Sequence, residues 1–192
     1  MRMMSENDVI NLIKQDRWMM DILFAVKQLD LPDWWVCAGF VRSKIWDVLH
    51  KRISRTPISD IDVIYFDREH MDETIEKEYE LHLNRLAPNL PWSVKNQARM
   101  HQRNHVQPYH SSVDAISKFP ETATSIGVRL DEGGELRIAA PHGMNDLVKL
   151  KVNPTPFFKE SNERMEIFRT RIKQKNWQRT WNQLTINLYE RE

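Results

Sequence analysis

The stretch Asp-Ile-Asp-Val-Ile-Tyr-Phe, residues 60–66, constrains the fold more than any other part of the sequence. Its β-branched and aromatic residues are typical of a buried strand. Because side chains alternate across a strand, Asp60 and Asp62 should lie on one face, with Ile61 and Val63 on the other, towards a core. Two carboxylates this close repel each other unless cations or water neutralise them. The strand therefore predicts a sheet with an acidic site on one face.

The segments around this strand mix helix and strand patterns. Apolar side chains predict further strands at residues 34–38, 92–100, 126–130 and 136–139. Helices are expected at residues 5–30, 41–49, 71–83, 113–119, 145–152 and 160–177. Residues 51–59 and 101–110 are expected to be polar loops, and residues 131–134, Asp-Glu-Gly-Gly, a hairpin turn. This order predicts an α+β fold, a mixed β-sheet with flanking helices.

The length of 192 residues suits one domain, or one domain with a small appendage. Residues 153–156, Asn-Pro-Thr-Pro, form a stiff connector before the final charged helix. We therefore expect one domain over residues 1–152 and a C-terminal helical extension, residues 153–192, packed on it.

Charge and cysteine content narrow the classes of function. The 28 basic and 27 acidic residues nearly balance, so nothing indicates a dedicated nucleic-acid or membrane binder. Cys37 is the only cysteine, which excludes an intrachain disulfide and a CxxC-type metal site. The start of the chain lacks an apolar signal core, and no apolar run approaches the ~20 residues of a membrane span. We expect a cytoplasmic protein without a membrane partner.

A second motif, Ala-Gly-Phe-Val-Arg-Ser at residues 38–43, lies where an expected strand turns into a helix. Gly39 permits close approach of a ligand to the backbone, and the N–H groups of a helix start attract phosphate. Arg42, in the first turn, can offer a charged fork to phosphate oxygens. The acidic strand suits Mg²⁺, which prefers oxygen ligands and keeps waters and phosphates in its shell. Taken singly, each motif is also compatible with a solvated strand start or a tight turn.

In this order the two motifs resemble those of the nucleotidyltransferase superfamily that includes DNA polymerase beta and the CCA-adding enzymes. Residues 38–42 are similar to the Gly-Gly-x-Val-Arg-Asp of CCA-adding heads, and residues 59–63, Ser-Asp-Ile-Asp-Val, to their Asp-Ile-Asp strand. Over about residues 34–181, the sequence also resembles a family of small bacterial nucleotidyltransferase-like proteins. The stretches Asn-Gln-Ala-Arg-Met-His at 96–101, Phe-Pro-Glu-Thr-Ala-Thr at 119–124 and Gly-Val-Arg-Leu at 127–130 contribute to it.

The resemblance implies a polymerase-beta-type nucleotidyltransferase fold and a metal-dependent reaction. A nucleoside monophosphate would pass from a nucleotide triphosphate to an acceptor hydroxyl, with release of pyrophosphate. Asp60 and Asp62 would be both the catalytic residues and the ligands of two Mg²⁺ (or Mn²⁺) ions. Gly39, Arg42 and Ser43 would bind the nucleotide through its β- and γ-phosphates. The acceptor is a small molecule, a protein side chain or an RNA end.

Two departures from the superfamily pattern keep an alternative open. Ala38 replaces the first glycine of the pair, and no third carboxylate is evident, since the expected strand 92–100 carries Asn96 and no acid. Asp67 or Asp114 would be the substitutes. The alternative is a catalytically weak or inactive nucleotide-binding or protein-interaction module of the same fold.

Three other groups of residues have a structural interpretation. His101 and His105 have the spacing of a helical metal pair, but they fall in an expected loop. The basic loop residues Lys51, Arg52 and Arg55 are able to meet phosphates or an RNA acceptor, although a solvated loop is the simpler interpretation. The tryptophans are expected to pack in the interior, because aromatic side chains contribute large buried areas.

Overall fold

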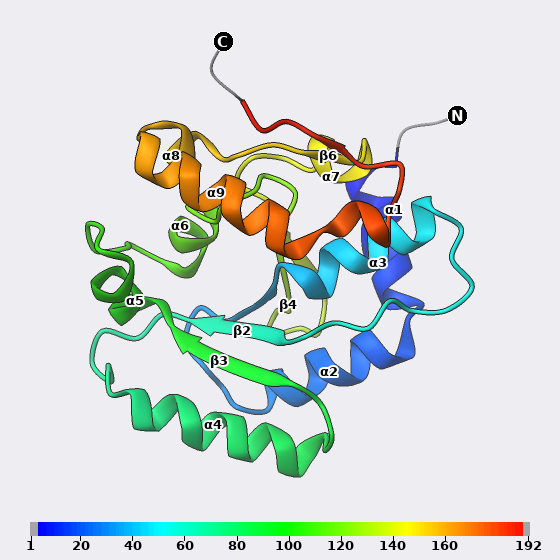
Figure 1. Ribbon diagram of the computed structural model, residues 1–192. Coiled ribbons are helices and arrows are strands. Elements are labelled where there is room, and N and C mark those ends of the chain that lie inside the picture. Colours follow the sequence, from blue (N-terminus) through cyan, green and yellow to red (C-terminus); the bar gives the residue numbers. More distant parts are fainter. Residues whose placement is uncertain (1–3, 190–192) are drawn as a thin grey trace.

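The computed structural model describes residues 4–189 and is built on a five-stranded sheet of strand order β3-β2-β1-β4-β5 (Figure 1). The strands are β1 (Trp35–Cys37), β2 (Ile61–Tyr65), β3 (Trp92–Asn96), β4 (Gly127–Leu130) and β5 (Leu136–Ala139). The pair β2–β3 is parallel, whereas β1–β2, β1–β4 and β4–β5 are antiparallel. The sheet is therefore mixed, and the predicted α+β fold is confirmed. The strand before the turn at Gly39, β1, lies next to β2.

Helices surround this sheet. They are α1 (Glu6–Lys14), α2 (Arg17–Lys27), α3 (Gly39–Leu49), α4 (Glu73–Leu86), α5 (Gln97–Asn104), α6 (Ser112–Ser117), α7 (Asn145–Val148), α8 (Pro156–Lys159), α9 (Asn162–Lys175) and the 3₁₀ turn Trp177–Arg179. A small parallel pair joins β6 (Lys151–Val152) to β7 (Thr185–Ile186). Figure 1 shows α2 and α4 below the sheet and α9 above β2. None of the helices within residues 4–189 is long and apolar enough to cross a membrane.

The N-terminal segment is two helices, so the expected single helix over residues 5–30 is wrong. Its start is correct, because Ser5 and Asp8 form a capping box. Asp16 then accepts a hydrogen bond from the backbone N–H of Met19 and begins a second helix. Both helices bury one apolar face in the same core. For this reason the apolar residues of the two helices follow one continuous helical spacing in the sequence.

Two further boundaries differ from expectation. The strand expected at 92–100 ends at Asn96, whose side chain accepts from the N–H of Ala98 and caps α5. Residues 97–104 are therefore helical rather than strand and loop. The helix expected at 145–152 stops at Val148, and residues 151–152 pair instead with β7.

The two faces of the sheet bury different sets of side chains. Val36, Val63 and Val94 belong to the main core, which also contains residues of α1, α2, α3 and α9. The opposite face packs Cys37 and Ile64 against α6. Six of the seven tryptophans are buried, which confirms the packing prediction for Trp34, Trp35, Trp46, Trp92, Trp177 and Trp181.

Candidate functional site

One pocket contains all five residues expected to bind substrate or metal. It has a volume of about 480 Å³ and is lined by Gly39, Arg42, Ser43, Asp60 and Asp62. Three short segments form the walls of the pocket: the start of α3, the residues leading into β2, and the end of α9 with the turn that follows it. The antiparallel pairing of β1 and β2 explains the first two, because the end of β1 lies beside the start of β2.

Within residues 4–189, Asp60 and Asp62 have no hydrogen-bond or ion-pair partner. Neither carboxylate accepts a hydrogen bond from, or forms an ion pair with, the residues that the structure describes. Burial, with a contribution from the charge of Asp60, raises the pKa of Asp62 to about 6. Arg171, Lys175 and Arg42 act in the opposite direction without cancelling this rise. An uncompensated carboxylate pair of this kind attracts a cation.

Arg42 is held by aromatic rings rather than by an acid. Its Cζ lies 4.4 Å from the ring centroid of Trp177, 5.1 Å from that of Trp46 and 5.6 Å from that of Trp181. Its Nη2 donates to the hydroxyl of Ser43 at 3.2 Å, and its buried Nε has no partner. Burial lowers the pKa of Arg42 to about 10, so the side chain stays charged at neutral pH. Among residues 4–189 no carboxylate forms an ion pair with it.

The turn before α3 combines a strained residue with an open position. Ala38 has φ 53° and ψ −114°, a conformation that favours glycine, and its carbonyl accepts from the N–H of Arg42. Gly39 is the first residue of the helix, and a Cβ added there would meet only Nη2 of Arg42, at 3.6 Å. A side chain at Gly39 is thus compatible with the fold but would extend towards Arg42, where a ligand would bind.

The positions considered for a third carboxylate do not supply one. Asn96 pairs with Tyr65 across β2–β3, whereas Asp62 pairs with Ser93, so Asn96 lies on the opposite face of the sheet. Its side chain holds the backbone of Asp67 and His70 together.

The two substitute acids are committed elsewhere. Asp67 pairs with His70 and Asp114 with Lys118, and neither lines the pocket. The described residues contain no cluster of three or more side chains able to bind a metal.

Sequence reasoning missed the contribution of α9, from which Arg171, Gln174 and Lys175 line the pocket. It had identified this segment only as a charged helix. Nothing local in a sequence indicates that residues about 130 positions apart share a pocket, so this wall required the fold.

The basic loop and the histidines are tied into the surrounding structure. Arg55 binds Asp16 at 2.6 Å and Arg52 lies 3.5 Å from Asp47. His101 lies in α5, and its Nδ1 is hydrogen-bonded to the carbonyl of Ala98. These contacts tie the basic loop to the rest of the fold, whereas the loop expected around His101 is wrong, because His101 lies within α5.

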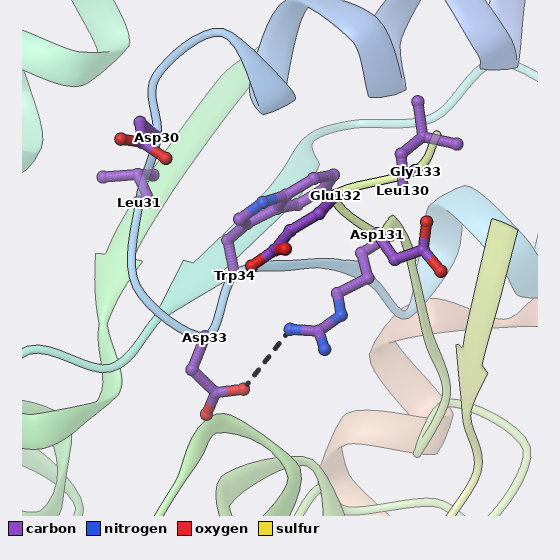
Figure 2. Close-up of a pocket in the computed structure, with 9 residues that line it drawn as sticks. Asp30, Leu31, Asp33, Trp34, Leu130, Asp131, Glu132 and Gly133 are labelled. Atoms are coloured by element: carbon purple, nitrogen blue, oxygen red, sulfur yellow. Dashed lines mark ion pairs between the residues drawn. The ribbon is translucent and has the colours of Figure 1, made fainter. Parts of the chain in front are cut away.

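A second pocket, of about 450 Å³, lies around Trp34 and the β4–β5 turn (Figure 2). Three of its charged side chains form ion pairs, whereas the buried Nε of Arg129 has no hydrogen-bond partner within residues 4–189. Arg129 lies 3.9 Å from Asp33, which also accepts from the N–H of Ser112, and Arg137 binds Asp131. None of the candidate residues lines it, so the pocket around Asp60 and Asp62 is the candidate active site.

Comparisons with known proteins agree with the fold. A family model described as nucleotidyltransferase matches residues 24–186. The chain is similar to a protein whose NMR structure reveals a CCA-adding enzyme head domain. The two are 36% identical, with a TM-score of 0.84 over 95% of this chain and 96% of the other. No curated protein matches the sequence.

Complete CCA-adding enzymes share the fold at lower identity. The Thermotoga maritima enzyme complexed with tRNA gives a TM-score of 0.56, and a CCA-adding enzyme complexed with CTP gives 0.57, each at 14% identity. In both cases the match covers 97% of this chain and 43% of the other, so the chain spans less than half of those enzymes. The chain belongs to the nucleotidyltransferase family and has the fold of a CCA-adding enzyme head domain.

Proposed function

We propose that the protein transfers a nucleoside monophosphate from a nucleotide triphosphate to an acceptor hydroxyl and releases pyrophosphate. One observation carries this proposal: two carboxylates without protein partners, Asp60 and Asp62, share a pocket with an arginine that has no carboxylate partner among the described residues, Arg42. A metal–triphosphate complex offers metal cations to the two carboxylates and phosphate anions to the arginine. Nucleotidyltransferase family membership supports the same reaction.

Asp60 and Asp62 would hold Mg²⁺ or Mn²⁺. Their oxygens are the ligand type that these ions prefer, and burial together with the charge of Asp60 raises the pKa of Asp62 despite the nearby cations. Two protein carboxylates are enough for Mg²⁺, which usually keeps several waters and substrate phosphates. When bound, divalent ions of this kind activate the acceptor hydroxyl and stabilise charge that develops around the α-phosphate.

The start of α3 would hold the β- and γ-phosphates. The first N–H groups of a helix lack partners within it, and they attract anions. Arg42 would add a permanent positive charge that needs no proton transfer. Ser43, whose hydroxyl accepts from Arg42, would keep the guanidinium in place. Gly39 leaves space for the phosphate beside Arg42.

The relatives indicate which nucleotide donors and which acceptor to test first. Related structures hold ATP, CTP and tRNA, which makes CTP and ATP the first donors to test and an RNA end the first acceptor. A small hydroxyl compound or a protein side chain remains a second acceptor class. A catalytically weak nucleotide-binding module is the alternative function. It is favoured because, of the residues that the structure describes, only two carboxylates line the pocket.

The proposal is tested by incubating the protein with each labelled nucleotide triphosphate, with Mg²⁺ or Mn²⁺, and with three acceptor pools: total RNA, protein, and small molecules from cell extract. Mass spectrometry would identify the labelled product. The expected result is one metal-dependent product that is absent with Asp62→Asn. Metal-dependent nucleotide binding without product from any pool would support the binding module and contradict the transferase.

A further inference from the structure

We propose that Arg171 and Lys175 of α9 form a second phosphate-binding wall of the pocket, and that the buried Glu121 positions Arg171 for this role. The inference rests on the proposed function, because it assumes that the pocket binds a nucleotide triphosphate. It goes beyond that function in assigning α9, which carries neither of the two sequence motifs, to phosphate binding. Figure 1 shows α9 passing above β2 with its last turn close to α3.

The guanidinium of Arg171 is anchored through Nε, whereas its two Nη groups have no hydrogen-bond partner among the described residues. Its Nε donates to Oε1 of Glu121 at 2.7 Å, and its Cζ lies 5.9 Å from the ring centroid of Trp177. Neither Nη makes a hydrogen bond with any residue between 4 and 189, and the side chain lines the pocket. A guanidinium anchored at Nε and open at both Nη groups is suited to bind phosphate oxygens in a fixed orientation.

Glu121 is a buried anchor rather than a third metal ligand. The residue is fully buried, and its Oε2 accepts from the hydroxyl of Thr124 at 2.7 Å. Its Oε1 is occupied by Arg171. Glu121 does not line the pocket and forms no metal-binding group with Asp60 and Asp62. A buried carboxylate needs such partners, and in satisfying this requirement it fixes the direction of the arginine.

The charge in this wall also points to an anionic ligand. Lys175 lines the pocket and makes no ion pair or hydrogen bond within the described part of the chain. Arg171 is close enough to Arg42 to disfavour its charged form. The sequence has no acidic residue from 167 to 189. Of the three cations, only Arg171 forms an ion pair among the described residues, and the charges of Asp60 and Asp62 also act on Arg42. Metal ions bound to the two aspartates would neutralise them and leave the cations free to bind a triphosphate.

The test compares the affinities of Mg²⁺–CTP and of CMP, with Mg²⁺–ATP and AMP as a second pair, by titration calorimetry. Arg171→Gln and Lys175→Met should each weaken triphosphate binding about ten-fold or more and change monophosphate binding far less. Arg171→Lys should recover only part of the loss, because lysine lacks the planar fork. Lys173→Met is the matched control on the same helix, because Lys173 is exposed and does not line the pocket. The triphosphate affinity of this variant should equal that of wild type.

Glu121 is tested through Arg171. Glu121→Gln should weaken triphosphate binding several-fold in the wild-type background and have no further effect beside Arg171→Gln. Because Arg171→Gln alone leaves the buried Glu121 charge unpaired, the double variant also supplies a folded protein in which Arg171 is absent.

Wild-type triphosphate affinity in folded Arg171→Gln and Lys175→Met would overturn the inference. If Asp62→Asn still abolished the metal-dependent part of binding in that case, the proposed function would stand. An absence of triphosphate binding by the wild-type protein would instead overturn both.

Discussion

At the scale of single residues, the turn from β1 into α3 stores backbone strain next to the pocket. Ala38 occupies the position of the first glycine in the Gly-Gly motif of CCA-adding heads, with φ 53° and ψ −114°. Strain of this kind costs of order 1–3 kcal/mol and persists only where the surrounding structure enforces it. Here the N–H of Ala38 donates to the carbonyl of Ile126, and its own carbonyl accepts from Val41 and Arg42.

Ala38→Gly should therefore stabilise the protein. Glycine removes the strain, and this gain exceeds the ~0.4–1 kcal/mol that the greater freedom of glycine in the unfolded chain costs. The expected result is a higher urea midpoint with an unchanged denaturant slope. A lower midpoint would contradict the backbone conformation assigned to Ala38.

Gly39→Ala separates folding from binding at the next position. Alanine is the better helix former by about 1 kcal/mol, and the added Cβ meets only Arg42 Nη2, so the ligand-free protein should be at least as stable as wild type. Affinity for Mg²⁺–CTP should fall, because the methyl group extends towards Arg42. Thermal unfolding and calorimetry on the same sample measure both effects, and unchanged affinity would exclude a phosphate beside Gly39.

Asp62→Asn should stabilise the metal-free protein at alkaline pH. Folding raises the pKa of Asp62 from 3.8 to about 6, so folding favours the protonated form. Its stabilising contribution is complete below about pH 4 and is lost as the pH rises through 6. Asparagine never ionises, so with a chelator present the variant should exceed wild type by on the order of 1 kcal/mol at pH 8. The difference should shrink towards pH 4, and a difference independent of pH would contradict the account.

At the scale of elements, the loop between α3 and β2 depends on one buried carboxylate. Asp47 accepts from the N–H of Thr56 at 2.8 Å, from the Thr56 hydroxyl at 2.6 Å and from Nε1 of Trp181 at 2.9 Å. The first two bonds hold the loop that leads to Asp60. The third ties the segment after α9 to α3. Asp47 therefore joins all three walls of the pocket without lining it.

Asp47→Asn should destabilise the protein by about 1–3 kcal/mol. The NH₂ group of asparagine cannot accept the hydrogen bonds that one carboxylate oxygen of Asp47 accepts, so at least one buried donor loses its partner. Asp21→Asn is the control, since Asp21 is exposed and lies 3.8 Å from Arg17 in a surface pair, and it should change stability by less than about 0.5 kcal/mol. Urea unfolding of both variants gives the comparison. Equal effects would contradict the role of Asp47.

Element boundaries mark where sequence reasoning succeeded and failed. The strand over residues 60–66 and the turn at Gly39 were predictable, because alternation and a strand-to-helix turn are local signals. The break at Asp16 and the end of β3 at Asn96 were not, because each depends on a side chain that turns back to cap a helix. Asn96 also shows that pairing register decides which face a strand residue occupies. That register is a tertiary property.

At the scale of the whole molecule, the pocket is assembled from segments far apart in the sequence. Arg42 is enclosed by tryptophans of α3 and of the turn after α9, about 135 residues later. The net charge of +1 gave no indication of an anion-binding region, because it averages over the chain and hides the cations gathered at the pocket. The two sequence motifs thus identified the walls formed by α3 and β2, and only the fold showed that α9 and the turn after it form the third wall.

The central claim is that Asp60 and Asp62 bind a metal together with a nucleotide triphosphate. Thermal unfolding with CTP or ATP, with and without Mg²⁺, tests it most directly, using Asp62→Ala and, as an acid outside the pocket, Asp67→Asn. At a ligand concentration about 100 times Kd, the wild-type protein should gain about 2.7 kcal/mol. Asp67→Asn should keep the metal-dependent part of this gain, and Asp62→Ala should lose it. A metal-dependent gain in Asp62→Ala equal to that of wild type would contradict the account.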